Sequence, residues 1–228
     1  MATLAAVRGR LVDACASVNR DVRTVTLVAV TKGFPASDIM SLAALGLTEF
    51  GESRDQEARA KIAEVERARL QPVPRWHFVG KLQTNKCRSI ARYASVVHSV
   101  DRPDVVTALA AGAERAERRL GVFAQVSLDA DPARGGVVPD QLVPLADQIA
   151  AAPALDLLGV MAIAPLGADP EAAFEQLAGI SARLRASHPD AKSISAGMSG
   201  DFEAAIRNGA THVRVGTALL GRRGDSFG

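Results

Sequence analysis

The sequence predicts an α/β fold in which a single (β/α)8 barrel (TIM barrel) spans residues 1–228, with an additional N-terminal helix before its first strand. Three observations lead to this fold class. Short apolar runs alternate with helical patterns about eight times, which predicts a parallel sheet with helices outside it. The chain has 228 residues, a length that suits one closed barrel. The Gly-x-Gly-x-x-Gly motif of a dinucleotide-binding sheet does not follow the first strand.

The first strand gives the clearest signal. Residues 27–31 carry no charge, and a continuous apolar run of this kind is typical of a strand buried on both faces. Apolar side chains at helical spacing over 3–19 predict the helix that precedes it. A helix over 37–45 follows, because Pro35 favours a helix start and Gly46 a helix end.

The same two patterns continue through the middle of the chain. A short strand over 48–50 ends in a turn, and the long charged helix after it reaches about residue 70, where Pro72 and Pro74 close the loop. The next expected elements are a strand over 75–79, a short helix ending near 92, a strand over 95–100 and an alanine-rich helix over 102–119.

The second half of the chain repeats the alternation. A strand over 121–127 leads into residues 129–136, whose Asp, Pro and Gly content predicts irregular and mobile backbone. The remaining expected elements are helices over 140–151, 170–187 and 201–208, and strands over 155–161, 192–195 and 211–215.

Composition excludes several classes of function. The net charge is +2, and no basic stripe with interleaved aromatic residues suggests nucleic-acid binding. The N-terminus lacks the unbroken apolar core of a signal peptide, and no later segment approaches a membrane span. Cys15 and Cys87 lack metal-ligand spacing, and we expect them to be free thiols in a reducing compartment. These features indicate a cytoplasmic protein with no membrane segment.

Lys32 directly follows the first strand and is the first candidate for chemistry. An ammonium group at the carboxyl end of a buried strand is partly desolvated, which lowers its pKa and makes the amine available to attack a carbonyl. A Schiff-base lysine needs this property. The alternative interpretation is a lysine that ends a strand and points to solvent.

Two glycine-containing turns follow the last two strands, where barrels place their active sites. Gly197 allows close approach of a ligand, and Ser199 offers a hydroxyl and suits the N-cap of the next helix. Gly216 and Thr217 repeat this combination after the eighth strand. Because such loops bind phosphate in many barrels, a Schiff-base lysine beside them indicates either pyridoxal phosphate or a phosphorylated sugar.

Arg214 helps to decide between these ligands. Pyridoxal enzymes that use the ring as an electron sink place a carboxylate at the pyridine nitrogen. An arginine cannot accept that proton, since its own pKa is above about 12. The ring nitrogen would stay unprotonated, and the cofactor would be a poor electron sink. The alternative for Arg214 is a salt bridge at the rim of the barrel.

The other polar residues give weaker signals. His77 lies between Trp76 and Phe78, and we expect it, like His98, to be packed and hydrogen-bonded inside the barrel rather than catalytic. The spacing of His, Cys and carboxylates does not suggest a metal site, and no nucleophile elbow is present.

Six motifs occur in order along the chain. They are Ala-Val-Thr-Lys at 29–32, Phe-Gly-Glu-Ser at 50–53, Trp-His-Phe-Val-Gly-Lys-Leu-Gln-Thr-Asn-Lys at 76–86, Leu-Gly-Val-Met-Ala at 158–162, Gly-Met-Ser-Gly-Asp at 197–201 and Val-Arg-Val-Gly-Thr-Ala at 213–218. Together they resemble the pyridoxal phosphate homeostasis protein family over nearly the whole chain. The resemblance implies the barrel of alanine racemase without its second, β-rich domain.

The resemblance also implies which residues hold pyridoxal 5'-phosphate. Lys32 would form the internal aldimine, and Arg214 would face the ring nitrogen. Near the cofactor, the family turn reads Gly-Glu-Asn, whereas this chain has the shorter Ser53 as its third residue. The residues implied to contact the phosphate are Met198 (through its backbone), Ser199, Gly216 and Thr217.

The resemblance implies a non-enzymatic protein that binds, buffers and supplies the cofactor. The expected partners are apo-enzymes that use pyridoxal phosphate, and we expect a monomer. The alternative is a weak amino-acid racemase, with a class I aldolase and a protein scaffold as more distant alternatives. Racemisation needs a second base on the opposite face of the cofactor, but the one tyrosine is Tyr93, in the segment that enters the fourth strand.

Overall fold

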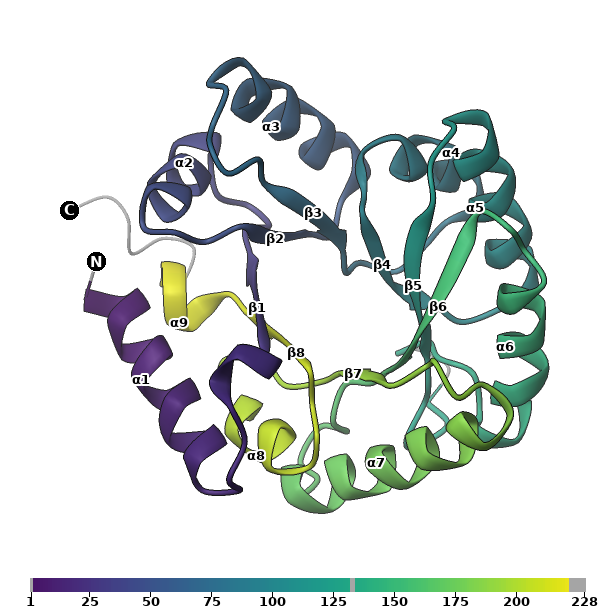
Figure 1. Cartoon of the computed structure of the whole chain (residues 1–228). Helices are drawn as coiled ribbons and strands as arrows, with labels where there is room; N and C mark the ends of the chain where they lie inside the picture. Colours follow the sequence, from purple (N-terminus) through teal and green to yellow (C-terminus); the bar gives the residue numbers. More distant parts are fainter. Residues whose placement is uncertain (1, 132–133, 222–228) are drawn as a thin grey trace.

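The computed structural model describes residues 2–131 and 134–221, which form a closed barrel of eight parallel strands in sequence order (Figure 1). The strands are β1 (Thr26–Val30), β2 (Glu49–Glu52), β3 (Arg75–Phe78), β4 (Val96–Val100), β5 (Leu120–Gln125), β6 (Leu155–Met161), β7 (Ser193–Ser195) and β8 (His212–Val215). The barrel closes because β8 pairs in parallel with β1, with Val28 opposite Arg214. The predicted (β/α)8 barrel is therefore confirmed.

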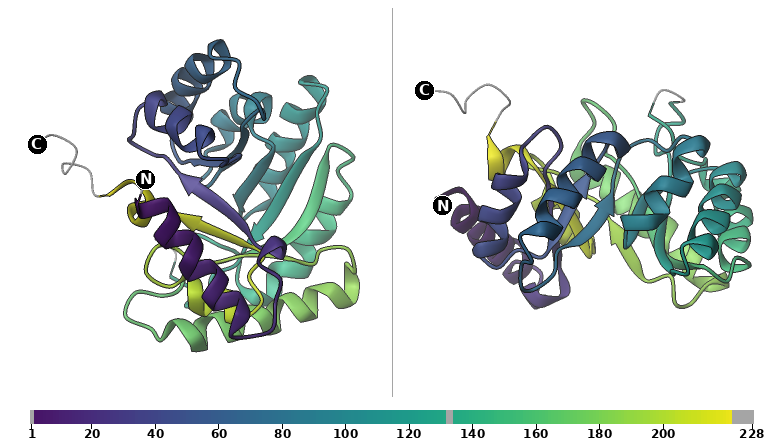
Figure 2. Two further views of the ribbon diagram at one scale, coloured as in Figure 1. Left: turned by 60° about the vertical axis from the view of Figure 1, so that its left-hand side comes forward. Right: turned by 90° about the horizontal axis from the view of Figure 1, so that it is seen from above.

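Helices cover the outside of the barrel. They are α1 (Ala2–Ala16), α2 (Ala36–Ala44), α3 (Asp55–Arg67), α4 (Thr84–Tyr93), α5 (Pro103–Arg115), α6 (Leu142–Ala150), α7 (Pro170–Ser187), α8 (Phe202–Arg207) and α9 (Thr217–Leu220), with short 3-10 turns η1 (Val22–Thr24) and η2 (Pro139–Gln141). Figures 1 and 2 show the N-terminal helix α1 alongside α8 and α9 on the outer surface. In the described part of the chain, no helix combines the length and apolar character that crossing a membrane requires.

The main difference from the sequence prediction is α9. This helix has four residues, too few to produce a helical pattern, and it begins directly after Gly216. Helix α3 ends at Arg67, before the expected end near residue 70, whereas α4 ends at Tyr93, close to the expected end near 92. In the expected loop over 129–136, residues 132 and 133 lie outside the described part of the chain.

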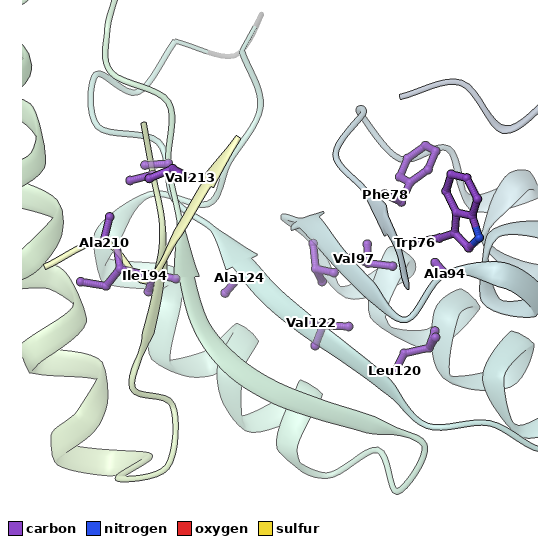
Figure 3. Packing of buried hydrophobic residues seen from close by; sticks show 14 of the residues in the cluster. Trp76, Phe78, Ala94, Val97, Leu120, Val122, Ala124, Ile194, Ala210 and Val213 are labelled. Atoms are coloured by element: carbon purple, nitrogen blue, oxygen red, sulfur yellow. The ribbon is translucent and has the colours of Figure 1, made fainter. Parts of the chain in front are cut away.

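The main hydrophobic core lies between the strands and the helices. Figure 3 shows part of it, including Trp76, Val97 and Val122 from three successive strands. Side chains of a strand alternate between its two faces, so their neighbours in sequence point into the barrel. A smaller apolar cluster of Val96, Phe123 and Met161 is consistent with this inner layer.

Candidate functional site

Lys32 lies in the turn between β1 and α2, two residues after the strand ends at Val30. Its side chain is exposed, so the desolvation expected from the strand pattern is wrong. The reason is that the strand stops before Lys32, and the turn carries the amine out of the apolar barrel. Lys32 lines a solvent-open cavity of about 340 Å³ at the carboxyl end of β1. The other lining residues are Gly33, Phe34, Ser53, Arg54, Glu57, Thr217 and Gly221.

A buried ion pair supports the turn that carries Lys32. Lys61 of α3 donates from Nζ to Glu52 Oε1 at 2.5 Å and to the Thr31 carbonyl at 2.7 Å. The Thr31 hydroxyl donates to the same Glu52 oxygen at 2.6 Å. The backbone immediately before Lys32 is therefore held by two side chains behind the turn.

The backbone immediately after Lys32 is held as well. Glu57 of α3 accepts a hydrogen bond from the Gly33 N–H, and one of its oxygens lies 3.0 Å from Lys61 Nζ. The sequence contains one signal for this arrangement, since Glu57 and Lys61 are four residues apart on a helix. That spacing usually indicates an exposed pair, so its role behind the Lys32 turn was missed.

Glu52 is a fully buried carboxylate in this cluster. Burial raises the pKa of Glu52, although hydrogen bonds from Lys61 and Thr31 act in the opposite direction. Its Oε2 atom has no hydrogen-bond partner among the described residues. The cluster is therefore sensitive to loss of Lys61, because a buried carboxylate without its counter-charge is costly.

The two glycine turns after β7 and β8 meet through a single hydroxyl. Ser199 Oγ accepts hydrogen bonds from the Gly216 N–H at 3.3 Å and from the Ala218 N–H at 3.1 Å. Gly197 has a φ of +88°, and a Cβ atom there would lie 2.7 Å from Phe202 Cα. The first turn therefore requires glycine for both conformation and space.

The helix that Ser199 caps differs from the predicted one. We expected its hydroxyl at the N-cap of the helix that follows, but the bonds to Gly216 and Ala218 place it at the start of α9 instead. Asp201 is the N-cap of α8, and its Oδ1 accepts from the Met198 N–H at 2.5 Å. The Met198 N–H is therefore occupied in this structure.

Helix α1 holds the Ser199 turn from outside the barrel. Arg10 donates to the Ser199 carbonyl at 3.1 Å and to Glu203 Oε1 at 2.5 Å. Its guanidinium carbon also lies 4.3 Å from the centre of the Phe202 ring. The additional N-terminal helix thus contributes directly to the rigidity of one turn of the site.

Arg214 points into the barrel from the middle of β8. Its Nη1 donates to Ser195 Oγ at 2.6 Å, and its Nη2 donates to the Ala162 carbonyl at 3.0 Å. Burial lowers the pKa of Arg214 to about 10, which leaves it a cation at neutral pH. Neither of these bonds joins it to a carboxylate, so the alternative of a rim salt bridge is wrong for the described residues.

The histidines lie as the sequence predicted. His77 and His98 are buried inside the barrel, and a hydrogen bond of 2.8 Å joins them. What the sequence did not reveal is that they form one continuous chain with Ser195 and Arg214. Residues 77 and 98 are far apart in sequence, and only barrel closure places all four side chains together.

The one tyrosine of the sequence lies away from Lys32. Tyr93, at the end of α4, lines a hollow with residues of α3 that include Gln56 and Arg59. Burial raises its pKa above the ordinary range of a tyrosine. Tyr93 does not line the Lys32 cavity.

The structure brings together most of the predicted site residues. Lys32, Ser53 and Thr217 line one cavity, and Gly216 joins that cavity to Ser199. Arg214 lies two residues before Gly216 on the inner side of β8. Among residues 2–131 and 134–221, no group of three or more His, Cys, Asp or Glu side chains is arranged to bind a metal ion.

Comparison with known proteins gives a consistent set of relatives. The family model described as "Alanine racemase, N-terminal domain" matches residues 8–224. The chain is 45% identical over 237 residues to the pyridoxal phosphate homeostasis protein of Mycobacterium leprae, covering 97% of this chain and 91% of that protein. Identity to the protein of the same name from Mycobacterium tuberculosis is 46% over 235 residues, with coverages of 96% and 91%.

A solved structure gives the same relationship in three dimensions. PipY of Synechococcus elongatus, solved with PLP bound, superposes with a TM-score of 0.82 at 35% sequence identity. The match covers 92% of this chain and 100% of that chain. The similarity therefore extends over most of this chain and the whole of that one.

Proposed function

Because the chain belongs to the pyridoxal phosphate homeostasis protein family, which carries the alanine racemase N-terminal domain, we propose that it binds pyridoxal 5'-phosphate and buffers or supplies it. The observation that carries the proposal is the cavity shared by Lys32 and Thr217. It brings a primary amine close to the first turn of α9, which holds the Ser199 hydroxyl and begins shortly after the buried Arg214 in sequence.

These donors fit the three polar groups of the cofactor. The cofactor supplies an aldehyde that a primary amine attacks reversibly with loss of water, and Lys32 is the amine that lines the cavity. A phosphate needs several hydrogen-bond donors, and we assign it to Ser199, Gly216 and Thr217. Arg214 supplies N–H donors for a ring nitrogen that has no proton of its own.

Three of the proposed contacts need adjustment in this chain. The Met198 N–H already donates to Asp201 and the Gly216 N–H to Ser199 Oγ, so each would reach the phosphate only after changing partner. Ser53 lines the Lys32 cavity, and its short side chain leaves open space where the family has asparagine. We therefore assign Ser53 to the rim of the site and Ser199 to its centre.

We favour a carrier over an enzyme on the same structural grounds. Tyr93 lines a different hollow from Lys32, so it does not supply a second base on the opposite face of the bound ring. The amine opens to solvent at the mouth of the barrel, which suits release of the cofactor to an apo-enzyme. The weak racemase is the alternative, and it predicts exchange of the α-proton of alanine in heavy water.

The first test is the colour of the purified protein. Loading with pyridoxal phosphate is expected to give a visible absorption band that borohydride fixes permanently, and Lys32→Ala is expected to remove it. The matched control is Lys192→Ala, since Lys192 is exposed just before β7 at the opposite end of the barrel. A band that survives in Lys32→Ala, or vanishes in Lys192→Ala, contradicts the assignment of the amine.

The second test separates supply from leakage. Loaded protein is mixed with an apo-transaminase in one chamber, and a second chamber holds the same enzyme behind a membrane that passes only the free cofactor. Faster recovery of activity in the mixed chamber supports direct supply. Equal recovery in both chambers leaves the protein as a passive buffer.

A further inference from the structure

A chain of hydrogen bonds crosses the interior of the barrel. From Arg214 Nη1 it passes to Ser195 Oγ (2.6 Å), and from that oxygen to His98 Nδ1 (2.7 Å). It continues from His98 Nε2 to His77 Nδ1 (2.8 Å) and from His77 Nε2 to Glu49 Oε2 (2.6 Å). Glu49 is the first residue of β2 and Ser195 the last of β7, so the chain runs between the two ends of the parallel sheet.

Such a chain is unusual inside a barrel of this class, where layers of branched apolar side chains normally fill the space. Here apolar residues such as Val96, Phe123 and Met161 fill only part of the interior. Buried polar groups are expensive unless every member is hydrogen-bonded, and a fully bonded set fixes one conformation. A buried row of polar side chains in which every member is hydrogen-bonded to the next therefore indicates that these bonds fix the orientation of the side chains.

The direction of each hydrogen bond follows from the two ends of the hydrogen-bond chain, since Arg214 can only donate and an ionised Glu49 can only accept. With neutral imidazoles between them, Ser195 Oγ accepts from Arg214 and gives its own proton to His98 Nδ1. His98 then carries its proton on Nε2 and donates to His77 Nδ1, and His77 Nε2–H donates to Glu49. Both imidazoles are neutral in this arrangement, and the carboxylate accepts the last bond.

The electrostatics agree with that direction. Burial is the main cause that holds the pKa of His98 well below its ordinary value, and the positive charge of Arg214 acts in the same direction. For Glu49, burial alone would raise the pKa, but the hydrogen bond from His77 and the charge of Arg75 keep it below the ordinary value. The proposed directions of the hydrogen bonds require a neutral His98 and an ionised Glu49, in agreement with these pKa shifts.

Two neutral acceptors, Ser195 Oγ and the Ala162 carbonyl, hold the guanidinium cation of Arg214. A carboxylate partner would bind the guanidinium at two points and offset its charge. We propose that Ser195 and His98 are positioning residues for Arg214, which they orient so that its remaining N–H groups meet the ring nitrogen of the cofactor. This inference rests on the proposed function.

The decisive measurement compares two ligands that differ only at that nitrogen. One is pyridoxal phosphate, and the other is its 1-deaza analogue, in which a C–H replaces the ring nitrogen. Ser195→Ala is expected to reduce the preference for pyridoxal phosphate by about tenfold, the value of one hydrogen bond to a charged group. A merely structural role would weaken both ligands equally and leave the preference unchanged.

Substitutions at His98 provide the second line of evidence. A glutamine side chain offers one acceptor and one donor, so His98→Gln should retain much of the preference, whereas His98→Leu should lose it. The control is His212→Asn, because His212 packs against His77 and His98 but its Nδ1 bonds to Thr211 outside the chain. Loss of the preference in the control and not in His98→Leu would overturn the inference.

The remaining outcomes are distinguishable. Failure of the unsubstituted protein to bind pyridoxal phosphate would overturn the proposed function and this inference together. Binding of both ligands with equal affinity would overturn the inference alone. Nitrogen-15 NMR spectra of the protein without ligand test the directions of these hydrogen bonds. The spectra should show neutral imidazoles with the proton on Nε2 in His77 and His98. A proton on Nδ1 of His98 would contradict the proposed direction.

Discussion

Loss of the buried lysine behind the Lys32 turn gives the most specific stability prediction. In Lys61→Met the apolar part of the side chain remains, but the hydrogen bonds to Glu52 and the Thr31 carbonyl disappear. The side chains of Lys61 and Glu52 are 8% and 1% exposed, so solvent does not screen the lost interaction. Glu52 is left as a buried carboxylate without its counter-charge.

The expected magnitude depends on pH. Removing one partner of a buried ion pair costs about 3–5 kcal/mol of unfolding free energy, and we expect this loss at about pH 8. Burial already raises the pKa of Glu52, so the folded state binds more protons than the unfolded state above the ordinary pKa of a glutamate. Stability therefore falls as pH rises through that window, and without Lys61 the pKa rises further and the window widens. Acidification should restore about 1.4 kcal/mol for each pH unit between the raised pKa of folded Glu52 and the ordinary pKa of a glutamate.

Urea unfolding at about pH 8 and about pH 5 measures this difference. The double variant Glu52→Gln with Lys61→Met should recover most of the loss and show no such pH dependence, since the buried charge is gone. Lys192→Met serves as the exposed control and should change stability by less than about 0.5 kcal/mol. An equal loss at both pH values in Lys61→Met would refute the reasoning, because the cost would then be packing rather than charge.

Three further predictions concern the glycine turns and the thiols. Ser199→Ala should weaken binding of pyridoxal phosphate about tenfold in equilibrium dialysis but leave pyridoxal, which has no phosphate, unchanged; equal weakening of both would argue against a phosphate contact. Gly197→Ala should destabilise the fold by about 1–3 kcal/mol in urea, and by more than Gly167→Ala, whose φ of +77° is similar but whose surroundings are open. Cys87 is buried and burial raises its pKa to about 11, so mass spectrometry should find it unalkylated at about pH 8 until urea unfolds the protein.

Local sequence patterns determined the barrel and its principal turns. Continuous apolar runs marked the strands, because strands of a parallel sheet are buried on both faces, and the positions of Lys32, Gly197 and Gly216 followed from the strand ends. The short helix α9 escaped prediction, since four residues carry no helical period. The sequence motifs alone indicated the family, and the comparisons with known proteins confirm it.

The tertiary structure determines the contacts between residues that are distant in sequence. Lys32 is exposed because β1 ends at Val30, a boundary that the apolar run alone does not fix. Ser199 caps α9 rather than α8 because the turns after β7 and β8 meet at the barrel mouth. The chain from Arg214 to Glu49 draws on five strands, and its members are neighbours only once the barrel is closed. The local sequence pattern predicts which face of a strand a side chain occupies. The identity of its hydrogen-bond partner depends on the register between strands and on the closure of the barrel, and no single segment of the sequence determines these.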